Sequence, residues 1–365
     1  MYNNKLYNTT YHNIDLSKHA FLVTGGAGFI GSNLVEYLLR FGAGRVRVLD
    51  NLSNGYFENI KDFLGLPNFE FVEGDIRDLE TCKRAVEGVH FISHQAALGS
   101  VPRSISDPLL SNEVNVSGFL NMLVAAKESP SLKQMVYAAS SSTYGDSPVL
   151  PKVEGNEGNP LSPYAVTKLV NELYADVFSK VYGFHTIGLR YFNIFGPKQN
   201  ANNPYAAVIP IFCKHFIEGT EPMINGDGET SRDFTFVENA VQANVKMMLI
   251  GEDAVRLRSG EAKKPRVEEV DVLISEALSV LATLPLSKHE VFNVACGDQI
   301  SLNEMVEMLC EISGKRIKAV YGNERPGDVK HSKASIAKLE GVCGYDPNFR
   351  FKEGLEIVYE WYNND

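Results

Sequence analysis

The fold is decided by the stretch "AFLVTGGAGFIGSNLVEYLLRFG", residues 20–42. It opens with an apolar run typical of a buried strand, continues through Gly25, Gly28 and Gly31, and then takes up a helical hydrophobic period. The next apolar run, "RVRVLD", ends at Asp50. A strand, a glycine-rich turn, a helix and a second strand that ends in a carboxylate form the pattern of a dinucleotide-binding βαβ unit. The sequence therefore predicts such a unit at its start.

The glycines and the carboxylate have separate tasks in that unit. Gly25 allows a tight turn, Gly28 lets the backbone approach a pyrophosphate, and Gly31 permits close packing of helix on strand. The N-terminus of the helix, near residues 30–41, supplies N–H donors and a positive dipole. Asp50 can accept both ribose hydroxyls and would repel a 2′-phosphate, which favours NAD over NADP.

Strand and helix patterns keep alternating as far as residue 196. The expected strands are "RVRVLD", "FEFVEGD", "VHFISH", "QMVYAAS" and "HTIGLRYFNIFG", and the longer expected helices lie near residues 30–41, 113–126 and 163–182. Such alternation predicts an α/β fold with a doubly wound parallel sheet of the Rossmann type. We expect an NAD-binding domain at 1–196, with 1–18 as an N-terminal extension. Residues 197–365 would form mainly a smaller α/β substrate domain, with segments near 233–250 and 291–295 as candidates for a return to the first domain.

Composition limits the class of ligand. The chain has 365 residues, 44% of them hydrophobic, and its net charge of -10 argues against a general binder of nucleic acid or of an anionic membrane. Five scattered cysteines without a C-x-x-C pair are typical of a reducing compartment. No signal-peptide core and no long apolar run is present, so we expect a cytoplasmic protein. No His, Cys and carboxylate spacing suggests a metal.

A second motif lies in "SPYAVTKLVNELYADVFSKVYG", residues 162–183. Ser162 as N-cap and Pro163 at the first position predict a helix, on which Tyr164 and Lys168 share one face. Its apolar stripe is formed by Val166, Leu169, Val170, Leu173, Val177 and Val181. About one Tyr-x-x-x-Lys pair is expected by chance in such a chain, so the pair needs support from elsewhere.

That support comes from "AASSSTYG", whose strand delivers Ser140 and Ser141 to the carboxyl edge of the sheet, where ligands bind. A phenol is a poor base at pH 7, but a cation at about 4 Å, at an effective dielectric near 20, is worth about 4 kcal/mol, or roughly three pKa units. Lys168 and an oxidised nicotinamide are both such cations. We therefore expect Tyr164 to remove a hydroxyl proton from an alcohol whose carbinol hydride passes to NAD, with Ser140 bonded to the same oxygen.

Further motifs add a family resemblance. In order along residues 20 to 340 they are "TGGAGFIG", "GDIRD", "HQAALGSVPRS", "ASSSTYGD", "SPYAVTK", "LRYFNIFGP", "INGDGETSRDF" and "RPGDVKHS". The chain resembles the extended short-chain dehydrogenase/reductases that act on nucleotide sugars. Within them it is most similar to the UDP-N-acetylglucosamine 4-epimerases, including relatives acting on N-acetylhexosaminuronates.

The resemblance implies a role for each matched position. Tyr164 matches the base, Lys168 the lysine that binds ribose and lowers the pKa of the phenol, and Ser140 the first hydroxyl, with Ser141 beside it. The implied NAD-binding residues are Gly25, Gly28, Phe29, Ile30, Gly31, Asp50, Asn51, Asp75, Ile76, Gln95, Ala96, Ala97, Asn115, Tyr164, Lys168 and Tyr191. The implied UDP-sugar-binding residues are Gly99, Ser100, Val101, Arg103, Ser140, Ser141, Ser142, Tyr164, Asn193, Val208, Asn225, Arg232, Arg325, Asp328 and Ser332. A homodimer through the helices near 113–126 and 163–182 is also implied.

The sugar is predicted from Ser332. In the resembled epimerases, the residue seven positions after the arginine of "RPGD" borders the sugar 2-position, and a small residue there goes with acceptance of an N-acetyl group. Ser332 therefore predicts interconversion of UDP-GlcNAc and UDP-GalNAc, or of the corresponding uronates. No single residue decides whether C6 is an alcohol or a carboxylate.

Three alternatives are open to such a chain. Nucleotide-sugar 4,6-dehydratases resemble one another in having Asp-Glu after the strand-end Thr, and UDP-glucuronate decarboxylases have Ser-Glu there. Ser141 and Ser142 occupy those positions here, which leaves no acid to protonate a leaving hydroxyl. A catalytically silent NAD-binding regulator is the third alternative, against which the intact Tyr164, Lys168 and Ser140 argue.

Overall fold

The computed structural model describes residues 5–201, 207–259, 289–324 and 330–364, without the side chains of 253–259. Its centre is a seven-stranded sheet in the order β11-β6-β5-β4-β1-β2-β3, and every pairing is parallel. The strands are β1 Ala20–Thr24, β2 Arg45–Asp50, β3 Phe69–Glu73, β4 Phe91–His94, β5 Gln134–Ser140, β6 Thr186–Tyr191 and β11 Glu290–Val294. The expected parallel sheet is confirmed.

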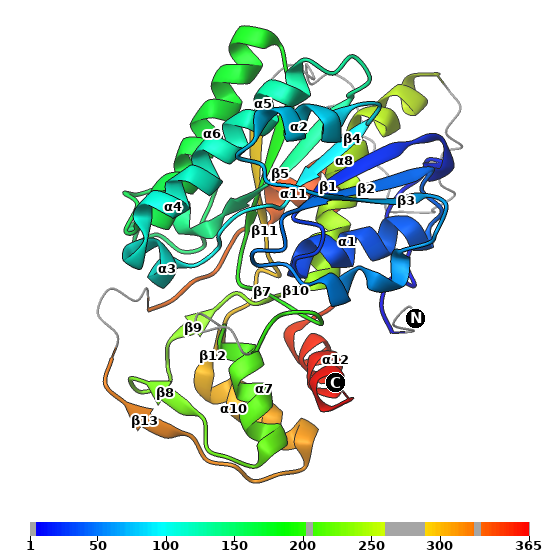
Figure 1. Ribbon diagram of the computed structural model, residues 1–365. Coiled ribbons are helices and arrows are strands. Elements are labelled where there is room, and N and C mark those ends of the chain that lie inside the picture. The colour runs from blue at the N-terminus through cyan, green and yellow to red at the C-terminus, as the bar shows by residue number, and fades with distance from the viewer. Residues whose placement is uncertain (1–4, 202–206, 260–288, 325–329, 365) are drawn as a thin grey trace.

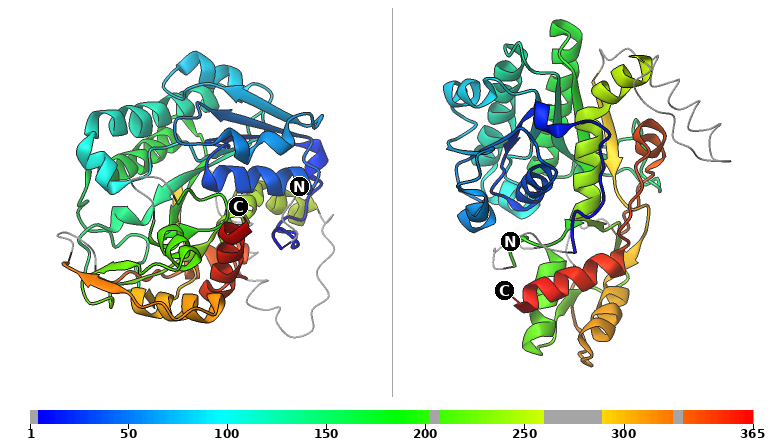
Figure 2. Two further views of the ribbon diagram at one scale, coloured as in Figure 1. Left: turned by 60° about the horizontal axis from the view of Figure 1, so that its bottom comes forward. Right: turned by 90° about the vertical axis from the view of Figure 1, so that its right-hand side faces the viewer.

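Helices cover both faces of this sheet (Figures 1 and 2). Phe21 and Val23 of β1 join the core under α1 and α8, whereas Leu22 between them joins the core under α2, α5 and α6. This alternation is what a strand buried on both faces requires. The helices of this layer are α1 Phe29–Arg40, α2 Leu79–Val86, α3 Val101–Ser106, α4 Pro108–Asn112, α5 Phe119–Lys127, α6 Pro163–Tyr182, α8 Val237–Ser259 and α11 Ala337–Cys343. Short single turns are η1 Leu16–Lys18, η2 Phe57–Asn59, η3 Lys61–Phe63 and η5 Ser141–Tyr144.

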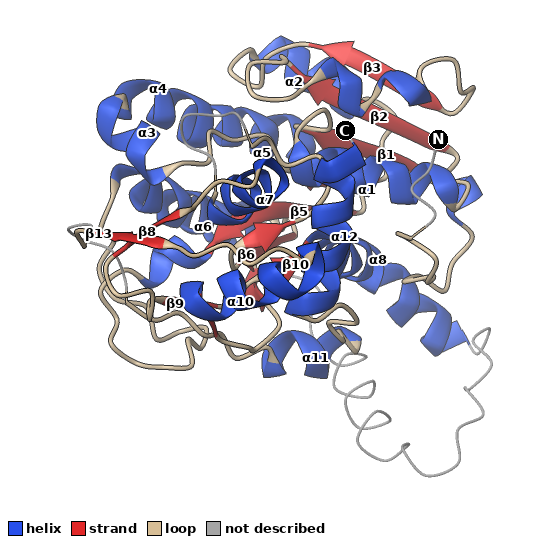
Figure 3. Ribbon diagram, turned by 90° about the horizontal axis from the view of Figure 1, so that it is seen from below, coloured by secondary structure: helices blue, strands red, loops and turns tan. Residues whose placement is uncertain are grey.

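A smaller region lies below the carboxyl edge of the sheet in Figure 1 and faces the viewer in Figure 3. It holds α7 Val208–Glu218, α10 Leu302–Ser313, α12 Phe351–Asn364 and the two-stranded pairs β8 Met223–Asn225 with β13 Val320–Gly322 and β9 Ser231–Arg232 with β12 Ile300–Ser301. The pair β7 Ile194–Phe195 and β10 Thr235–Phe236 connects it to the sheet. From β10 the chain passes directly into α8 of the sheet layer. The strand β11 then pairs with β6, before the chain returns to the smaller region at β12.

Residues 5–18, here called the N-terminal segment, pack on the sheet layer although the sequence suggested no role for them. Tyr7 is fully buried and donates from its hydroxyl to Asn33 Oδ1 (2.6 Å), and its backbone N–H donates to Glu238 Oε2 (3.0 Å). The hydroxyl of Tyr11 donates to the other oxygen of Glu238 (2.7 Å). The segment thus joins α1 to the start of α8.

The helix that carries Tyr164 begins and ends as the sequence predicts. Ser162 Oγ accepts from Ala165 N–H, Pro163 is the first helical residue, and Gly183 ends the helix at a φ of +63°. Its apolar stripe, however, is not buried in the core. The exposed fractions are 48% for Val166, 58% for Leu173, 49% for Val177 and 65% for Val181.

The helix expected near 113–126 has two parts. Glu113–Gly118 form a π-helical turn, η4, and α5 follows it. Within the turn, Asn115 accepts from Leu98 N–H (2.8 Å) and donates to Leu98 O (3.1 Å). Wide turns of this kind often occur at functional sites. In the described part of the chain no helix is both long and apolar enough to cross a bilayer.

Candidate active site

A cavity of about 660 Å³ lies at the carboxyl edge of the sheet. The chain continues from β1 to β2 and β3 on one side and to β4, β5 and β6 on the other, so this is the topological switch point where open α/β sheets bind ligands. Residues expected to bind the cofactor or the substrate that line the cavity are Gly25, Gly28, Phe29, Ile30, Gly31, Asp50, Asn51, Asp75, Ile76, Gln95, Ala96, Ala97, Gly99, Ser100, Val101, Ser140, Ser141, Tyr164, Lys168, Tyr191 and Asn193.

The glycine turn has the shape that a pyrophosphate needs. Gly25 has a φ of +67°, and a Cβ on it would lie 2.7 Å from Ala96 N. A Cβ on Gly28 would meet only Gly25 O at 3.1 Å, on the side of the cavity. A Cβ on Gly31 would lie 2.2 Å from Gly25 O. The close packing at Gly31 is therefore against the turn itself, whereas we expected it against the strand.

Asp50 is held at the end of β2 with its carboxylate towards this turn. Oδ2 accepts from Ala27 N–H and Oδ1 from Leu52 N–H, both at 2.9 Å. Burial raises the pKa of Asp50, and these two N–H groups lower it. Each oxygen keeps a second lone pair, which suits the two hydroxyls of a ribose.

Arg77, which follows β3 next to the cavity residues Asp75 and Ile76, is already paired. Arg77 Nη2 lies 2.8 Å from Asp75 Oδ2, and Nη1 lies 3.3 Å from Glu113 Oε2. The hydrogen bonds from Arg77 lower the pKa of Asp75 to about 2. Asn51 donates to the same Asp75 oxygen (2.9 Å). A guanidinium held in this way offers little to a 2′-phosphate, in agreement with NAD.

Ser140 and Tyr164 meet at the other end of the cavity. Ser140 is the last residue of β5 and the N-cap of η5, and it lines the cavity together with Tyr164. Ser142 donates to Ser140 Oγ from its hydroxyl (2.9 Å) and from its N–H (3.1 Å). Burial raises the pKa of Tyr164, and the neighbouring hydroxyl of Ser140 lowers it.

Lys168 lies beside this pair and is 97% buried, since only 3% of it is exposed. Its Nζ donates to Ala138 O (2.8 Å) and lies 5.9 Å from the centroid of the Tyr164 ring. Burial lowers the pKa of Lys168 to about 8, and the carboxylate of Glu172 opposes that shift. In the protein alone, burial therefore has a larger effect on the phenol than Lys168, although we expected the lysine to dominate.

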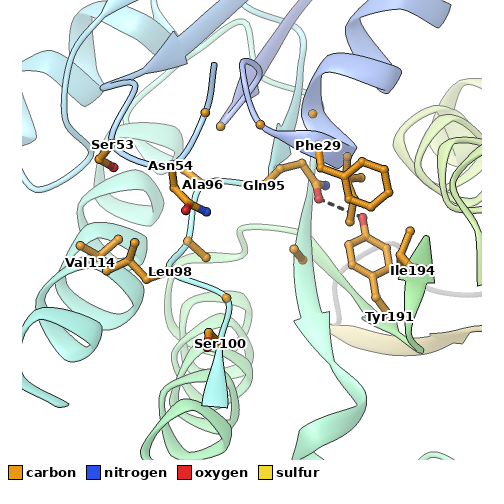
Figure 4. A pocket seen from close by; sticks show the side chains of 18 of the residues that line it. Phe29, Ser53, Asn54, Gln95, Ala96, Leu98, Ser100, Val114, Tyr191 and Ile194 are labelled. Carbon is orange, nitrogen blue, oxygen red and sulfur yellow. Dashed lines mark hydrogen bonds between the residues drawn. The ribbon is translucent and has the colours of Figure 1, made fainter. Parts of the chain in front are cut away.

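Figure 4 shows the wall between the two ends, where Tyr191 points towards Gln95 and Phe29 lies beside them. Tyr191 Oη donates to Gln95 Oε1 (3.2 Å) and accepts from Asn244 Nδ2 (2.7 Å). Gln95 in turn donates to Ser93 Oγ (2.8 Å). The polar groups on this wall come from β4, β6 and α8, so their positions depend on the whole sheet layer.

Other expected site residues lie outside the cavity lining. The side chain of Asn115 is hydrogen-bonded to the backbone of Leu98. Arg103 donates to Asn54 (3.2 Å) in the loop after β2. Ser142, Val208, Asn225, Arg232 and Ser332 do not line the cavity; the last four belong to the smaller region. The N–H of Ser332 donates to Ser231 O (3.1 Å), beside Arg232. Arg325 and Asp328 lie outside the described residues.

The structure adds two loops to the expected lining. One follows Asp50 and contributes Ser53, Asn54, Gly55 and Tyr56. The other follows β7 and contributes Lys198, Gln199 and Asn200. The first could have been found from its position directly after a strand-ending carboxylate, because loops at the carboxyl edge surround the ligand. Among the residues described, no cluster of His, Cys, Asp and Glu could hold a metal ion.

Known proteins resemble this chain over nearly its full length. A putative UDP-glucose 4-epimerase of Methanocaldococcus jannaschii is 32% identical, with 94% of this chain and 98% of that protein covered. A UDP-N-acetylglucosamine 4-epimerase from Methanobrevibacter ruminantium M1, solved with UDP-N-acetylmuramic acid, is 33% identical and superposes with a TM-score of 0.80 over 95% and 98% of the two chains. A UDP-glucuronic acid 4-epimerase from Bacillus cereus, solved with UDP-glucuronic acid and NAD, is 26% identical with a TM-score of 0.78 over 94% and 99%.

The family model described as the NAD dependent epimerase/dehydratase family matches residues 21–256, which include the glycine turn, the Ser140 turn and the Tyr164 helix. The resemblance and the NAD cofactor expected from the motifs are thereby confirmed. The chain belongs to the NAD-dependent epimerase/dehydratase family.

Proposed function

We propose that this chain is an NAD-dependent UDP-sugar 4-epimerase that interconverts UDP-GlcNAc and UDP-GalNAc, or the corresponding uronates. The observation that carries the proposal is that Ser140, Tyr164 and Lys168 line one cavity together with the glycine turn and Asp50. The known 4-epimerases named above cover nearly the whole chain and support the reaction. UDP binding is assigned mainly to residues 197–365.

Each of the three side chains has a task that suits its position. When bound, NAD supplies a reversible hydride acceptor for C4 of the sugar. Tyr164 takes the proton of the 4-hydroxyl and returns it to the same oxygen when C4 is reduced. Ser140 donates to the same oxygen, because its own oxygen already accepts from Ser142. Lys168 favours the phenolate and binds the ribose.

The cavity does not suit the related eliminations. A dehydratase must protonate a leaving hydroxyl, which calls for a carboxylic acid near the sugar. The carboxylates among the described residues lining the cavity are Asp50 and Asp75, on β2 and after β3. The hydroxyl of Ser142, in the position where an acid would be needed, is turned onto Ser140.

Turnover distinguishes the proposed activity from its rivals. An epimerase should form UDP-GalNAc from UDP-GlcNAc without net NADH, which NMR of the sugar anomeric signals and absorbance of NADH can follow together. Stoichiometric NADH would indicate a dehydrogenase, and loss of water or carbon dioxide a dehydratase or decarboxylase. NAD binding without turnover on any UDP-sugar would favour the regulator.

The choice of an acetylated sugar rests on Ser332. The relatives named above carry the names of glucose, N-acetylglucosamine and glucuronic acid epimerases, so their names do not decide the sugar. A small residue leaves room for an acetamido group, which a tyrosine would exclude by steric overlap. We expect Ser332→Tyr to lower kcat/KM for UDP-GlcNAc by at least about 10²-fold and to leave that for UDP-Glc within about threefold. A wild-type preference for UDP-Glc would contradict the assignment.

We also propose that the enzyme is a homodimer through α5 and α6. These helices pack side by side on one face of the sheet, and the outer stripe of α6 is apolar and half exposed. Val166, Leu173, Val177 and Val181 are spaced by seven, four and four residues, so they share one face of the helix, as a helix-pairing surface does. A second copy presenting the same stripe would cover it.

A further inference from the structure

Three charged side chains lie behind the catalytic pair and line no part of the cavity. Arg190 on β6 donates from Nε to Glu172 Oε1 (2.9 Å) and from Nη2 to Glu172 Oε2 (2.7 Å), and its Nη1 is paired with Glu157. The side chain of Arg190 is 3% exposed and that of Glu172 9% exposed. Two carboxylates on one guanidinium leave this triad with a net charge of -1.

The triad is placed next to Lys168. Glu172 follows Lys168 by one helical turn on α6, so their Cβ atoms are about 5–6 Å apart. Lys168 is as deeply buried as Glu172 and Arg190. Its Nζ donates a hydrogen bond to the backbone oxygen of Ala138. The -1 of the triad and the +1 of Lys168 therefore form a neutral cluster inside the protein.

The same guanidinium supports the turn that carries Ser140. Arg190 lies over the ring of Tyr144 at 4.9 Å, and Tyr144 is the last residue of η5, whose N-cap is Ser140. The hydroxyl of Tyr144 donates to Asn293 on β11 (2.7 Å). Glu172 is therefore one helical turn from Lys168 and is linked through Arg190 to the turn that bears Ser140.

We propose that Glu172 is a positioning residue for the reaction: it keeps the buried Lys168 ammonium protonated and, through Arg190, fixes the turn that bears Ser140. This inference rests on the proposed function, because Lys168 and Ser140 act there. A buried ammonium loses its proton readily unless an anion lies close by. An uncharged Lys168 would no longer favour the phenolate of Tyr164.

The other groups around Lys168 do not replace Glu172. From β4 the nearest is His94, which accepts from or donates to Thr24 and whose pKa burial lowers to about 3, so it carries no charge near neutral pH. The neighbours on α6 and β6 are Tyr164, Tyr191 and Arg190. Of these three, Arg190 is the charged one, and its charge is positive. Among these described neighbours Glu172 is the nearby anion.

Loss of the Glu172 carboxylate should move the alkaline limb of the pH profile to lower pH. Activity needs Lys168 charged, so the alkaline limb of the pH profile reports its pKa. Burial has already lowered that pKa to about 8 against the opposing effect of Glu172. Loss of the carboxylate lowers it further, and the limb moves to lower pH by about one unit. At pH values above the pKa of Lys168, a shift of one unit lowers the rate about tenfold relative to wild type.

The test compares wild type with Glu172→Gln, Glu157→Gln and Glu172→Asp, by kcat/KM for UDP-GlcNAc between about pH 6 and 10. Glu157→Gln is the matched control: it removes one charge and one partner of Arg190, but its side chain is 24% exposed and lies on the loop before α6. We expect a shift of about one unit for Glu172→Gln, less than half of that for Glu157→Gln, and a smaller shift of the same sign for Glu172→Asp. If Glu172→Gln does not fold, the smaller shift expected for Glu172→Asp tests the proposal instead.

A second readout does not depend on turnover. NMR titration of enzyme with ¹³C-labelled lysines, in which the Lys168 signal is identified by its loss in Lys168→Arg, gives the pKa of Lys168 in the NAD-bound enzyme. If wild type turned over no UDP-sugar, the proposed function would fail, while the titration would still measure the effect of Glu172. An unchanged pKa of Lys168 in folded Glu172→Gln, or an equal shift in Glu157→Gln, would overturn the inference.

Discussion

Leu173→Glu should convert the proposed homodimer into a monomer. Leu173 lies in the middle of the exposed stripe of α6 and is 58% exposed in the single chain. Full burial of a leucine side chain is worth about 1.5–3 kcal/mol, so covering the exposed part contributes about 1–1.5 kcal/mol. A twofold interface contains this position twice, which gives about 2–3 kcal/mol per dimer.

A glutamate at this position does more than remove apolar area. Two like charges brought together and stripped of water add a further penalty, and the total then exceeds about 3 kcal/mol. Each 1.4 kcal/mol is tenfold in Kd, so the dimer should weaken by more than about 10²-fold. Helix α6 itself should remain folded, because its buried face, with Ala165, Ala175 and Phe178, is unchanged.

Sedimentation velocity and light scattering over nanomolar to micromolar concentrations measure this shift. Met223→Glu is the matched control, since Met223 is of similar size and 62% exposed but lies on β8 in the smaller region. A monomeric wild type at micromolar concentration, or equal behaviour of the two variants, would refute the reasoning.

The remaining predictions concern the cavity. Tyr164→Phe should lower turnover by about 10² to 10⁴-fold and keep bound NAD, because only the acid/base group is lost; steady-state rates and NAD content check this, and loss of NAD would mean that the phenol serves mainly in binding. Asp50→Ala should weaken NAD binding and relax discrimination against NADP, since the carboxylate that meets the ribose hydroxyls is gone; calorimetric Kd values for both cofactors check it, and an unchanged ratio would show that Asp50 does not recognise the ribose.

The parts of the fold that could be predicted are those encoded by local chemistry. The glycine turn and the Ser162 and Pro163 start of α6 both depend on residues a few positions apart, and the structure has each of them. Burial is different, because it depends on which elements meet. The stripe of α6 has the period of a core face, yet the core takes the opposite face, with Lys168 and Glu172 on it.

The site divides in the same way. Residues at the ends of β1, β2, β4 and β5 could be placed from strand order alone, because parallel strands end at one edge. The loop carrying Lys198 and the triad at Arg190 could not, since their partners are far away in sequence: Lys198 pairs with Glu36 (2.8 Å), and Arg190 joins residues from α6 and from the loop before it. No spacing pattern in the sequence predicts such ion pairs.

The N-terminal segment sets an order of events during synthesis. The N–H of Tyr7 pairs with Glu238, 231 residues later, and Lys5 pairs with Glu360, almost at the other end of the chain. At about 5–20 residues per second, the ribosome needs on the order of ten to fifty seconds to make Glu238 after Tyr7. The N-terminal segment therefore docks only after the start of α8 has been made, and until then Tyr7, Tyr11 and the face of α1 that they cover stay exposed to chaperones and proteases.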